Sequence, residues 1–267
     1  MTAETDAAGS RPRASQGSEG PEGPEAGTTA RLPRMRRIIA SRMTESLRVA
    51  AQLTAVQEVD VTAVAELRSR VKGSFLEVEG VPLSYLPFFI RALVEAGQDF
   101  PRFNASIDET GTQITYHAGV HVGIAVDTPR GLVVPVLRDA QAMSIPEIAR
   151  GVAALAGRVR EGLAGPDELT GSTITLSNIG GAGTLTDTPI INYPEVAILG
   201  TGAVVRRPRV VAAGDGTESI LIRSVCSLPL TYDHRLIDGA DAGRFLAAIR
   251  RRLEAADFTA DLAAYGA

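Results

Sequence analysis

A change of hydrophobic period near the C-terminus places one histidine between a strand and a helix. The apolar run over residues 219–230 predicts a buried strand, and from Ala240 onward the apolar residues recur at helical spacing. His234 lies between the two, where a rigid scaffold can expose a single side chain. An imidazole has an unperturbed pKa of about 6.5, which suits proton transfer near neutral pH. The junction makes His234 a candidate general base.

Asp238 follows His234 by four residues, a spacing that puts both side chains on one side of a helical or turn-like segment. The same pattern is typical of a capped helix start, and it could also form part of a metal site. No cysteine or second histidine lies near enough in the sequence to complete a metal site. The pattern by itself leaves a catalytic pair and a helix cap open.

The composition limits the classes of protein that this chain can be. With 267 residues, of which 45% are hydrophobic, it can bury one large core or two small ones. A net charge of −4 argues against a general binder of nucleic acid or of anionic membranes. A single cysteine, Cys226, excludes an internal disulfide framework and a CxxC pair. No apolar run approaches the ~18 residues that span a bilayer, and no signal-peptide pattern is present, so we expect a cytoplasmic protein.

Residues 1–29 contain no Leu, Ile, Val or aromatic residue. Such a segment cannot bury enough apolar surface to offset the entropy of ordering it. We therefore predict a disordered tail or linker remnant over residues 1–31. The folded domain is expected to begin near Leu32.

From residue 32 to 267 the chain predicts one mixed α/β domain without an internal repeat. Ser144 and Glu147 fit a capping box, and Ser84 fits a helix N-cap. The predicted helices cover residues 34–51, 62–70, 84–98 and 144–162 and the segment after 240, and the predicted strands cover residues 53–61, 104–107, 113–117, 121–126, 132–137, 172–177, 195–202, 204–211 and 219–230.

The first predicted helix carries an apolar stripe with arginines distributed around it. Two interpretations stay open for this helix. Its arginines could form a solvated basic face, or the helix could pack on a neighbouring subunit or receive a phosphorylated ligand. The apolar stripe consists of Met35, Ile38, Ile39, Met43 and Leu47, and the arginines are Arg34, Arg36, Arg37 and Arg42.

Two further patterns predict structural roles. The glycine cluster 180–183 follows a strand, but it lacks the lysine of a Walker loop and no helix start comes after it. Its glycines are expected to let the backbone approach a ligand or another strand closely. His117 and His121 flank a strand start, and an extended chain does not bring such a pair to one metal ion, so both are predicted to be structural.

Residues 233–239, Asp-His-Arg-Leu-Ile-Asp-Gly, resemble the DHRxxDG motif of the catalytic domain of dihydrolipoamide acyltransferases. These are the acyl-transferring components of 2-oxo acid dehydrogenase complexes. Residues 35–43, 58–62, 123–136, 176–180 and 188–200 resemble further blocks of that family, in its order. The resemblance covers about residues 32–264. It implies an α/β (two-layer α+β) fold like that of chloramphenicol acetyltransferase, with a mixed sheet flanked by helices. It also implies a homotrimer with active sites between subunits, and trimers that assemble further into cubic or icosahedral cores.

The resemblance implies a role for each of four residues. His234 would be the general base that removes the proton from the thiol of coenzyme A or dihydrolipoamide, whose unperturbed pKa is about 8.5. Ser177 would donate a hydrogen bond to the tetrahedral oxyanion from the neighbouring subunit's side of the channel. Asp238 would pair with Arg68 to maintain the channel's geometry.

The lysine content sets this chain apart from complete acyltransferases. A lipoyl domain carries its cofactor on a lysine at a hairpin tip, and the single lysine here, Lys72, lies within the catalytic block. We expect no lipoyl domain, no peripheral-subunit-binding domain and no covalently bound cofactor, and a lipoyl group supplied by another chain. Dehydrogenase-complex subunits would be further partners.

The alternatives are acyl transfer from acyl-CoA to a small acceptor and a non-catalytic trimeric core. Acetyl or succinyl transfer is favoured over branched-chain acyl transfer.

Overall fold

The computed structural model describes residues 26–129, 131–212 and 214–267. Contacts divide the chain into two units, Met1–Pro33 and Arg34–Ala267. Most of the predicted tail over residues 1–31 lies outside the described residues, so both its disorder and the domain boundary at residue 32 stay predictions. The helices and strands of the described residues belong to the second unit, which contains the predicted junction at His234.

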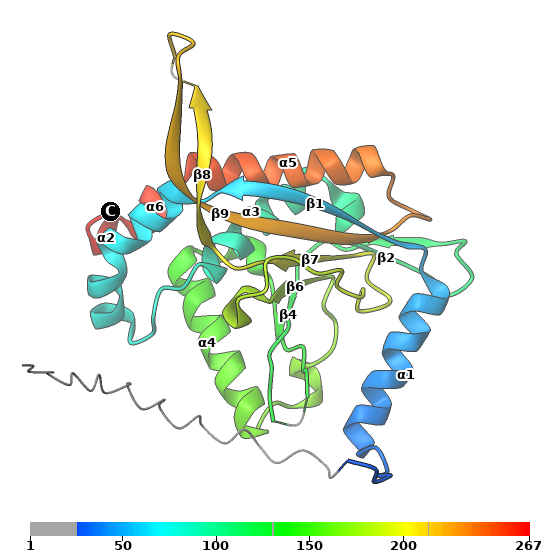
Figure 1. Ribbon diagram of the computed structural model, residues 1–267. Helices are drawn as coiled ribbons and strands as arrows, with labels where there is room; N and C mark the ends of the chain where they lie inside the picture. The colour runs from blue at the N-terminus through cyan, green and yellow to red at the C-terminus, as the bar shows by residue number, and fades with distance from the viewer. Residues whose placement is uncertain (1–25, 130, 213) are drawn as a thin grey trace, which may run out of the picture. The chain divides into compact units, whose positions relative to one another are not determined.

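A seven-stranded mixed sheet forms the centre of the second unit (Figure 1). Its order is β1-β9-β7-β6-β4-β5, with β8 pairing along the outer part of β9. Strands β4, β6 and β7 run parallel to one another, and the remaining pairs are antiparallel. The strands are β1 (Gln52–Asp60), β4 (Val122–Ile124), β5 (Val136–Leu137), β6 (Ile174–Asn178), β7 (Ala197–Thr201), β8 (Val205–Ala212) and β9 (Glu218–Asp233), and a separate two-stranded sheet contains β2 (Ala105–Ile107) and β3 (Ile114–Tyr116).

Helices flank this sheet, as predicted. They are α1 (Arg34–Val49), α2 (Thr62–Glu79), α3 (Leu86–Asp99), α4 (Ile145–Glu161), α5 (Gly239–Ala255) and the short α6 (Thr259–Leu262). Helix α5 lies along β1 and β9 (Figure 1), and α3 packs against both α4 and α5. Within the described residues, no helix is both long and apolar enough to cross a lipid bilayer.

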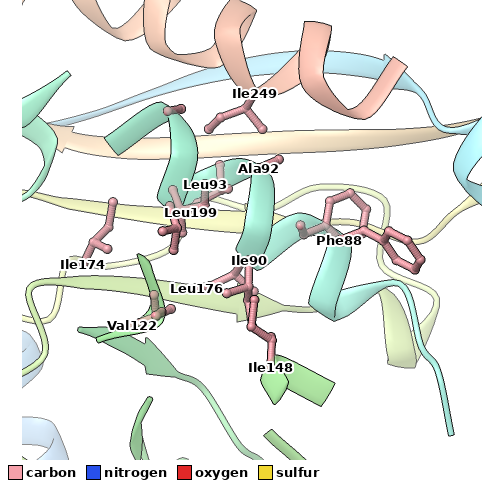
Figure 2. Close-up of a cluster of buried hydrophobic side chains, with 14 of the residues drawn as sticks. Phe88, Ile90, Ala92, Leu93, Val122, Ile148, Ile174, Leu176, Leu199 and Ile249 are labelled. Atoms are coloured by element: carbon pink, nitrogen blue, oxygen red, sulfur yellow. The ribbon is translucent and has the colours of Figure 1, made fainter. Parts of the chain in front are cut away.

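Helix α3 is the centre of the hydrophobic core (Figure 2). Most of its side chains are buried, among them Phe88, Ile90 and Leu93. Its polar side carries the partly exposed ion pair of Arg91 and Glu95 at 2.7 Å, and the wide apolar remainder must be covered. The strands and the other helices provide that cover, through side chains that include Leu176 and Ile249.

Helix α1 is the opposite case, because most of its surface faces solvent. Ser46 is its only buried residue, and the apolar side chains of Met35, Ile38 and Leu47 are exposed. Other parts of the fold also expose large apolar side chains, among them β1 (Leu53 and Val56) and the hairpin of β8 and β9 (Val210, Ile220, Leu221 and Ile222). Among the described residues, nothing covers these side chains of α1, β1 and the hairpin.

The structure corrects several predicted boundaries. Helix α2 ends at Glu79 and not at residue 70, because Val71 and Phe75 continue its buried stripe. Helix α3 has its N-cap at Tyr85, while the Ser84 hydroxyl accepts the Leu86 N–H at 3.3 Å. Strand β5 contains only two residues, whereas a strand was predicted over 132–137.

Other boundaries agree with prediction. The capping box is confirmed: the Ser144 N–H donates to the Glu147 carboxylate at 2.8 Å. Strand β9 continues to Asp233, and α5 begins at Gly239, so His234 lies between a strand and a helix as predicted.

Candidate active site

The turn from β9 to α5 is fixed through its backbone. The Asp233 N–H donates to the Val196 carbonyl, and the His234 N–H donates to the Ala51 carbonyl, each at 2.9 Å. Just beyond them, Ile237 is fully buried. The turn is therefore attached to β1 and to the segment before β7, while the His234 side chain is exposed.

The Asp233 carboxylate adds a second set of contacts to this turn. Its side chain is 1% exposed, and it accepts hydrogen bonds from the Arg235 Nη2 at 2.7 Å and from the Ala51 N–H at 3.3 Å. The Arg235 Nε also donates to it at 3.0 Å, and this pairing raises the pKa of the guanidinium. A bidentate pair of this kind fixes geometry as well as charge. Sequence reasoning gave Asp233 and Arg235 no role, although both lie in the motif. A carboxylate at the end of a buried strand needs a partner. In the sequence, Asp233 follows an apolar run and an arginine stands two residues later, which could have indicated this pair.

The His234 imidazole has one neighbouring ring, that of Tyr232, at 5.9 Å between centroids. Across the described ranges, no hydrogen bond is recorded to either of its ring nitrogens. An exposed imidazole with a fixed backbone can accept a proton from a ligand that reaches it.

Ser177, the predicted oxyanion donor, lies near the end of β6 and is half-buried. The glycine cluster that follows it packs closely against the end of β7. A Cβ on Gly180 would lie 2.5 Å from the Gly202 carbonyl oxygen, and one on Gly202 would overlap the carbonyl of Leu185. Close backbone approach is thus confirmed as a role of glycines in this segment.

The strand register separates Ser177 from His234 within one chain. Ser177 pairs with Gly200, and a Cβ on Gly200 would meet the Pro229 side chain at 2.6 Å, so Ser177 is level with Pro229 of β9. His234 lies five residues further on. That is about 17 Å along the strand and, with two strand spacings of nearly 5 Å each, roughly 20 Å in total. The two side chains of one chain cannot contact the same substrate carbonyl.

The predicted pair of Asp238 and Arg68 does not form within a single chain, and a pairing between subunits stays a prediction. Asp238 is the exposed N-cap residue of α5, next to the first residues of β1. Arg68 lies on α2, which follows the other end of β1 (Figure 1). Its Nε donates to the Leu83 carbonyl at 2.6 Å, and its guanidinium lies 5.0 Å from the centre of the Tyr85 ring. A strand of nine residues, about 30 Å long, separates the two ends. Arg68 anchors the segment before α3.

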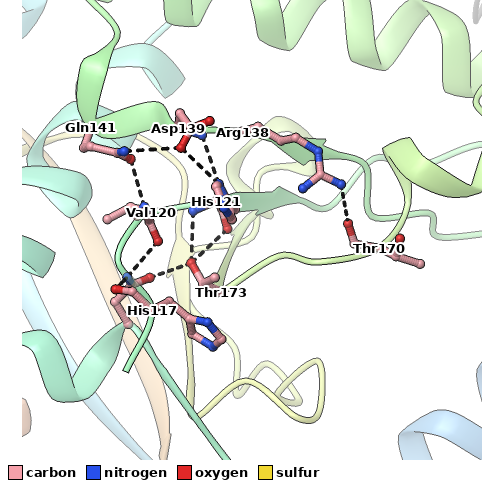
Figure 3. Close-up of polar contacts among 10 residues, drawn as sticks. His117, Val120, His121, Arg138, Asp139, Gln141, Thr170 and Thr173 are labelled. Carbon is pink, nitrogen blue, oxygen red and sulfur yellow. Dashed lines mark hydrogen bonds and ion pairs between the residues drawn. The ribbon is translucent and has the colours of Figure 1, made fainter. Parts of the chain in front are cut away.

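His117 and His121 are held by protein groups, and Figure 3 shows the contacts of His121 with Asp139 and Thr173. The His117 Nε2 lies 3.1 Å from the Ser106 hydroxyl, and the His121 Nδ1 accepts the Asp139 N–H at 3.0 Å. Burial, together with the charge of His121, lowers the pKa of His117. Both histidines have the structural contacts predicted for them. Elsewhere in the described part of the chain, no cluster of three or more His, Cys, Asp or Glu side chains could hold a metal ion.

The fold and the histidine turn belong to a known class of transferase. Residues 24–260 match the profile of the family described as "2-oxoacid dehydrogenases acyltransferase (catalytic domain)". This chain belongs to that family, as its motifs predicted.

Individual relatives support this assignment. The chain is 53% identical over 236 residues to the dihydrolipoyllysine-residue acetyltransferase component of the pyruvate dehydrogenase complex of Mycobacterium bovis, covering 88% of this chain and 43% of the relative. It is 52% identical to the component of the same description from Corynebacterium glutamicum, and the match covers 88% of this chain and 35% of that relative. The chain thus spans less than half the length of these curated relatives.

One solved structure was determined in a study of the catalytic mechanism of a related protein. It was determined to study a serine, a histidine and an asparagine in the catalytic mechanism of Azotobacter vinelandii dihydrolipoamide acetyltransferase. The TM-score is 0.80 at 33% identity, covering 91% of this chain and 99% of that one.

Proposed function

We propose that this chain transfers an acyl group between a dihydrolipoamide thioester and coenzyme A, with the lipoyl group carried outside this sequence. The observation that carries the proposal is the exposed imidazole of His234, on a turn whose backbone is held by Ala51 and Val196. The family of the chain and the descriptions of its relatives supply the reaction class. The coenzyme A thiol and the lipoyl thioester are substrates, and no protein cofactor takes part.

In the proposed reaction His234 takes the proton of the coenzyme A thiol. The thiolate attacks the thioester carbonyl of the acyl-dihydrolipoamide, and the carbonyl oxygen becomes an oxyanion. The Ser177 hydroxyl donates a hydrogen bond to that oxyanion, a contact that strengthens as charge develops. When the tetrahedral intermediate collapses, the dihydrolipoamide sulfur leaves and takes the proton from the His234 imidazolium. The serine and histidine named for the Azotobacter relative are of the same residue types, and the asparagine differs from Asp238.

We propose that each site combines His234 of one subunit with Ser177 of the next, in a homotrimer. Two observations support a shared site. The register separates these side chains by roughly 20 Å within one chain. In addition, apolar side chains of α1, β1 and the β8–β9 hairpin are exposed and have no partner among the described residues. For α1, this favours packing on a neighbouring subunit over a purely solvated basic face.

Mass measurement in solution should give a trimer or a multiple of three, because only an assembly completes the proposed site. Dilution to monomers should remove acyl transfer together with the assembly. Light scattering and activity measured on the same dilution series check this. A monomer that retains full activity would rule out the shared site.

Acetyl is the acyl group that the relatives favour. The relatives at 52–53% identity are acetyltransferase components, whereas a succinyltransferase component of Pseudomonas aeruginosa is 42% identical. Initial rates with acetyl-, succinyl- and isobutyryl-CoA against dihydrolipoamide test this choice, and we expect the highest kcat/KM for acetyl-CoA. A preference for another acyl-CoA would revise the acyl group and leave the reaction class in place.

The source of the lipoyl group is a separate part of the proposal. Lys72, the single lysine, is an exposed residue within α2, which is not the hairpin tip that lipoylation requires. A lipoyl domain, together with other subunits of a dehydrogenase complex, would then be a partner of this chain.

The alternatives are an acyl-CoA-dependent transferase with a small acceptor and a non-catalytic core. A cytoplasmic location also stays a prediction.

An acetylated lipoyl domain should be a much better substrate than free acetyl-dihydrolipoamide. The surface of the domain adds binding energy, and it raises the effective concentration of the lipoyl arm at the site. Side-by-side measurement of kcat/KM for the two substrates checks this. A ratio near one, combined with consumption of a small hydroxyl or amine acceptor, would favour the chloramphenicol acetyltransferase type of reaction.

A further inference from the structure

Glu195 is a buried carboxyl that the proposed reaction does not use. It precedes β7 and is 2% exposed. Three neutral donors surround it: the Ser172 hydroxyl at 2.5 Å, the Thr175 hydroxyl at 2.7 Å and the Asn192 amide at 2.8 Å. We call these three residues the Glu195 cage.

No positive charge balances this carboxyl. Over the described residues, no arginine, lysine or histidine forms an ion pair with Glu195. The titratable side chains on neighbouring elements include His117, whose Nε2 lies against the Ser106 hydroxyl of β2, and His121, next to the start of β4. At the end of β9, next to Val196, they also include Asp233, which is paired with Arg235, and His234. Desolvation by burial raises the pKa of Glu195 to about 7, although the three donors act in the opposite direction. Near neutral pH the group can therefore gain or lose its proton.

The Glu195 cage is connected to both candidate catalytic elements. The residue after Glu195 is Val196, whose carbonyl accepts the Asp233 N–H at 2.9 Å, directly before His234. Thr175 of the cage is on β6, two residues before Ser177 and on the same face of that strand. One carboxyl thus links the strand that carries Ser177 to the segment that supports His234.

Building on the proposed acyl transfer, we propose that Glu195 is a positioning residue that acts in its protonated form. A neutral carboxyl can donate its proton to the Ser172 hydroxyl oxygen and accept hydrogen bonds from Thr175 and Asn192. The cage then stays closed and excludes water. An ionised carboxylate in the same place has no countercharge and needs water. Opening the cage to water would shift β6 and Val196, and with them Ser177 and the turn at His234.

The first test compares the wild-type protein with Glu195→Gln. The amide keeps the size of the side chain and cannot ionise. We expect the two proteins to have similar kcat at pH 6. At pH 8, one unit above a pKa of about 7, only about a tenth of the wild-type protein has a protonated Glu195 carboxyl. Because only that form is proposed to be active, the kcat of the variant at pH 8 should exceed that of the wild type by about tenfold. Parallel pH profiles of the two proteins would overturn the proposal.

Glu195→Ala supplies the contrast, because it removes the cage contacts at every pH. It should lower kcat at pH 6 and at pH 8 with a smaller effect on KM, and glutamine should rescue this loss where alanine does not. If glutamine is as damaging as alanine at pH 6, the carboxylate is the required form and the proposal is wrong.

A measurement without activity keeps this inference separate from the proposed function. In NMR of the wild-type protein with ¹³C-labelled glutamate carboxyls, one resonance absent from Glu195→Gln should titrate near pH 7. Because the folded pKa is raised above 4.5, ionisation destabilises the fold, so the wild-type Tm should fall relative to that of Glu195→Gln as pH rises from 4.5 to about 7. A Glu195 resonance that titrates below pH 5 would overturn the inference. Failure of the wild-type protein to transfer acyl groups would instead contradict the proposed function.

Discussion

Replacing His234 by alanine should abolish acyl transfer between coenzyme A and dihydrolipoamide while the fold and the assembly stay unchanged. General-base catalysis contributes on the order of 100-fold to 10,000-fold in rate. The exposed carboxylate of Asp238 in the same segment is a much weaker base than an imidazole, since the unperturbed pKa of an aspartate is about 3.9. The side chain is exposed, and the turn is held by the His234 backbone, which alanine retains. The measurement is kcat/KM for acetyl-CoA with dihydrolipoamide, together with Tm and solution mass.

His121→Ala is the matched control for this prediction. It also removes a partly exposed imidazole, one whose Nδ1 accepts the Asp139 N–H. His121 is level with Asp233 in the strand register but lies three strands away across the sheet, about 14 Å from the turn at His234. Its kcat/KM should remain within a few-fold of wild type. Activity of His234→Ala at that same level would remove His234 from the mechanism.

Ser177→Ala should lower kcat by about two orders of magnitude with little change in KM, since loss of one oxyanion donor costs on the order of 100-fold to 1,000-fold. A hydrogen bond that strengthens in the transition state affects kcat, whereas uniform substrate binding affects KM. Steady-state kinetics with both substrates varied separate these two effects.

Ser74→Ala removes another hydroxyl as a control, one that bonds the Tyr265 carbonyl at 2.6 Å in a different part of the fold. It is expected to change stability and to leave kcat unchanged. A rise in KM at constant kcat for Ser177→Ala would make Ser177 a binding residue and not an oxyanion donor.

The sequence predicted those features that depend on local periodicity and on a short motif. The turn at His234 was found because the hydrophobic period changes from strand to helix between residues 230 and 240. The capping box at Ser144 was found because its two residues are three positions apart. Helix α2 was predicted too short, because it continues through Gly73 to Glu79. An isolated glycine within a helical pattern weakens the prediction of a helix without excluding it.

Features that depend on strand order could not be predicted in the same way. The absence of an Arg68–Asp238 pair within one chain could not be read from the sequence, because β1 carries the chain to the far end of the sheet before α2 begins. The separation of Ser177 from His234 follows from the pairing of β6, β7 and β9, which no local pattern encodes. Glu195 begins an apolar strand, where a charged residue is commonly exposed, and its burial results from the segments around it.

A subunit-mixing experiment tests the shared site most directly. Co-expressed and co-purified His234→Ala and Ser177→Ala chains assemble into mixed trimers, in which an intact His234 can face an intact Ser177. If each site takes one residue from each of two neighbouring chains, random equal mixing makes about a quarter of the sites complete, so about a quarter of wild-type activity should return. Each variant alone stays at a few per cent or less. Activity in the mixture no higher than the average of the two separate variants would contradict the shared site.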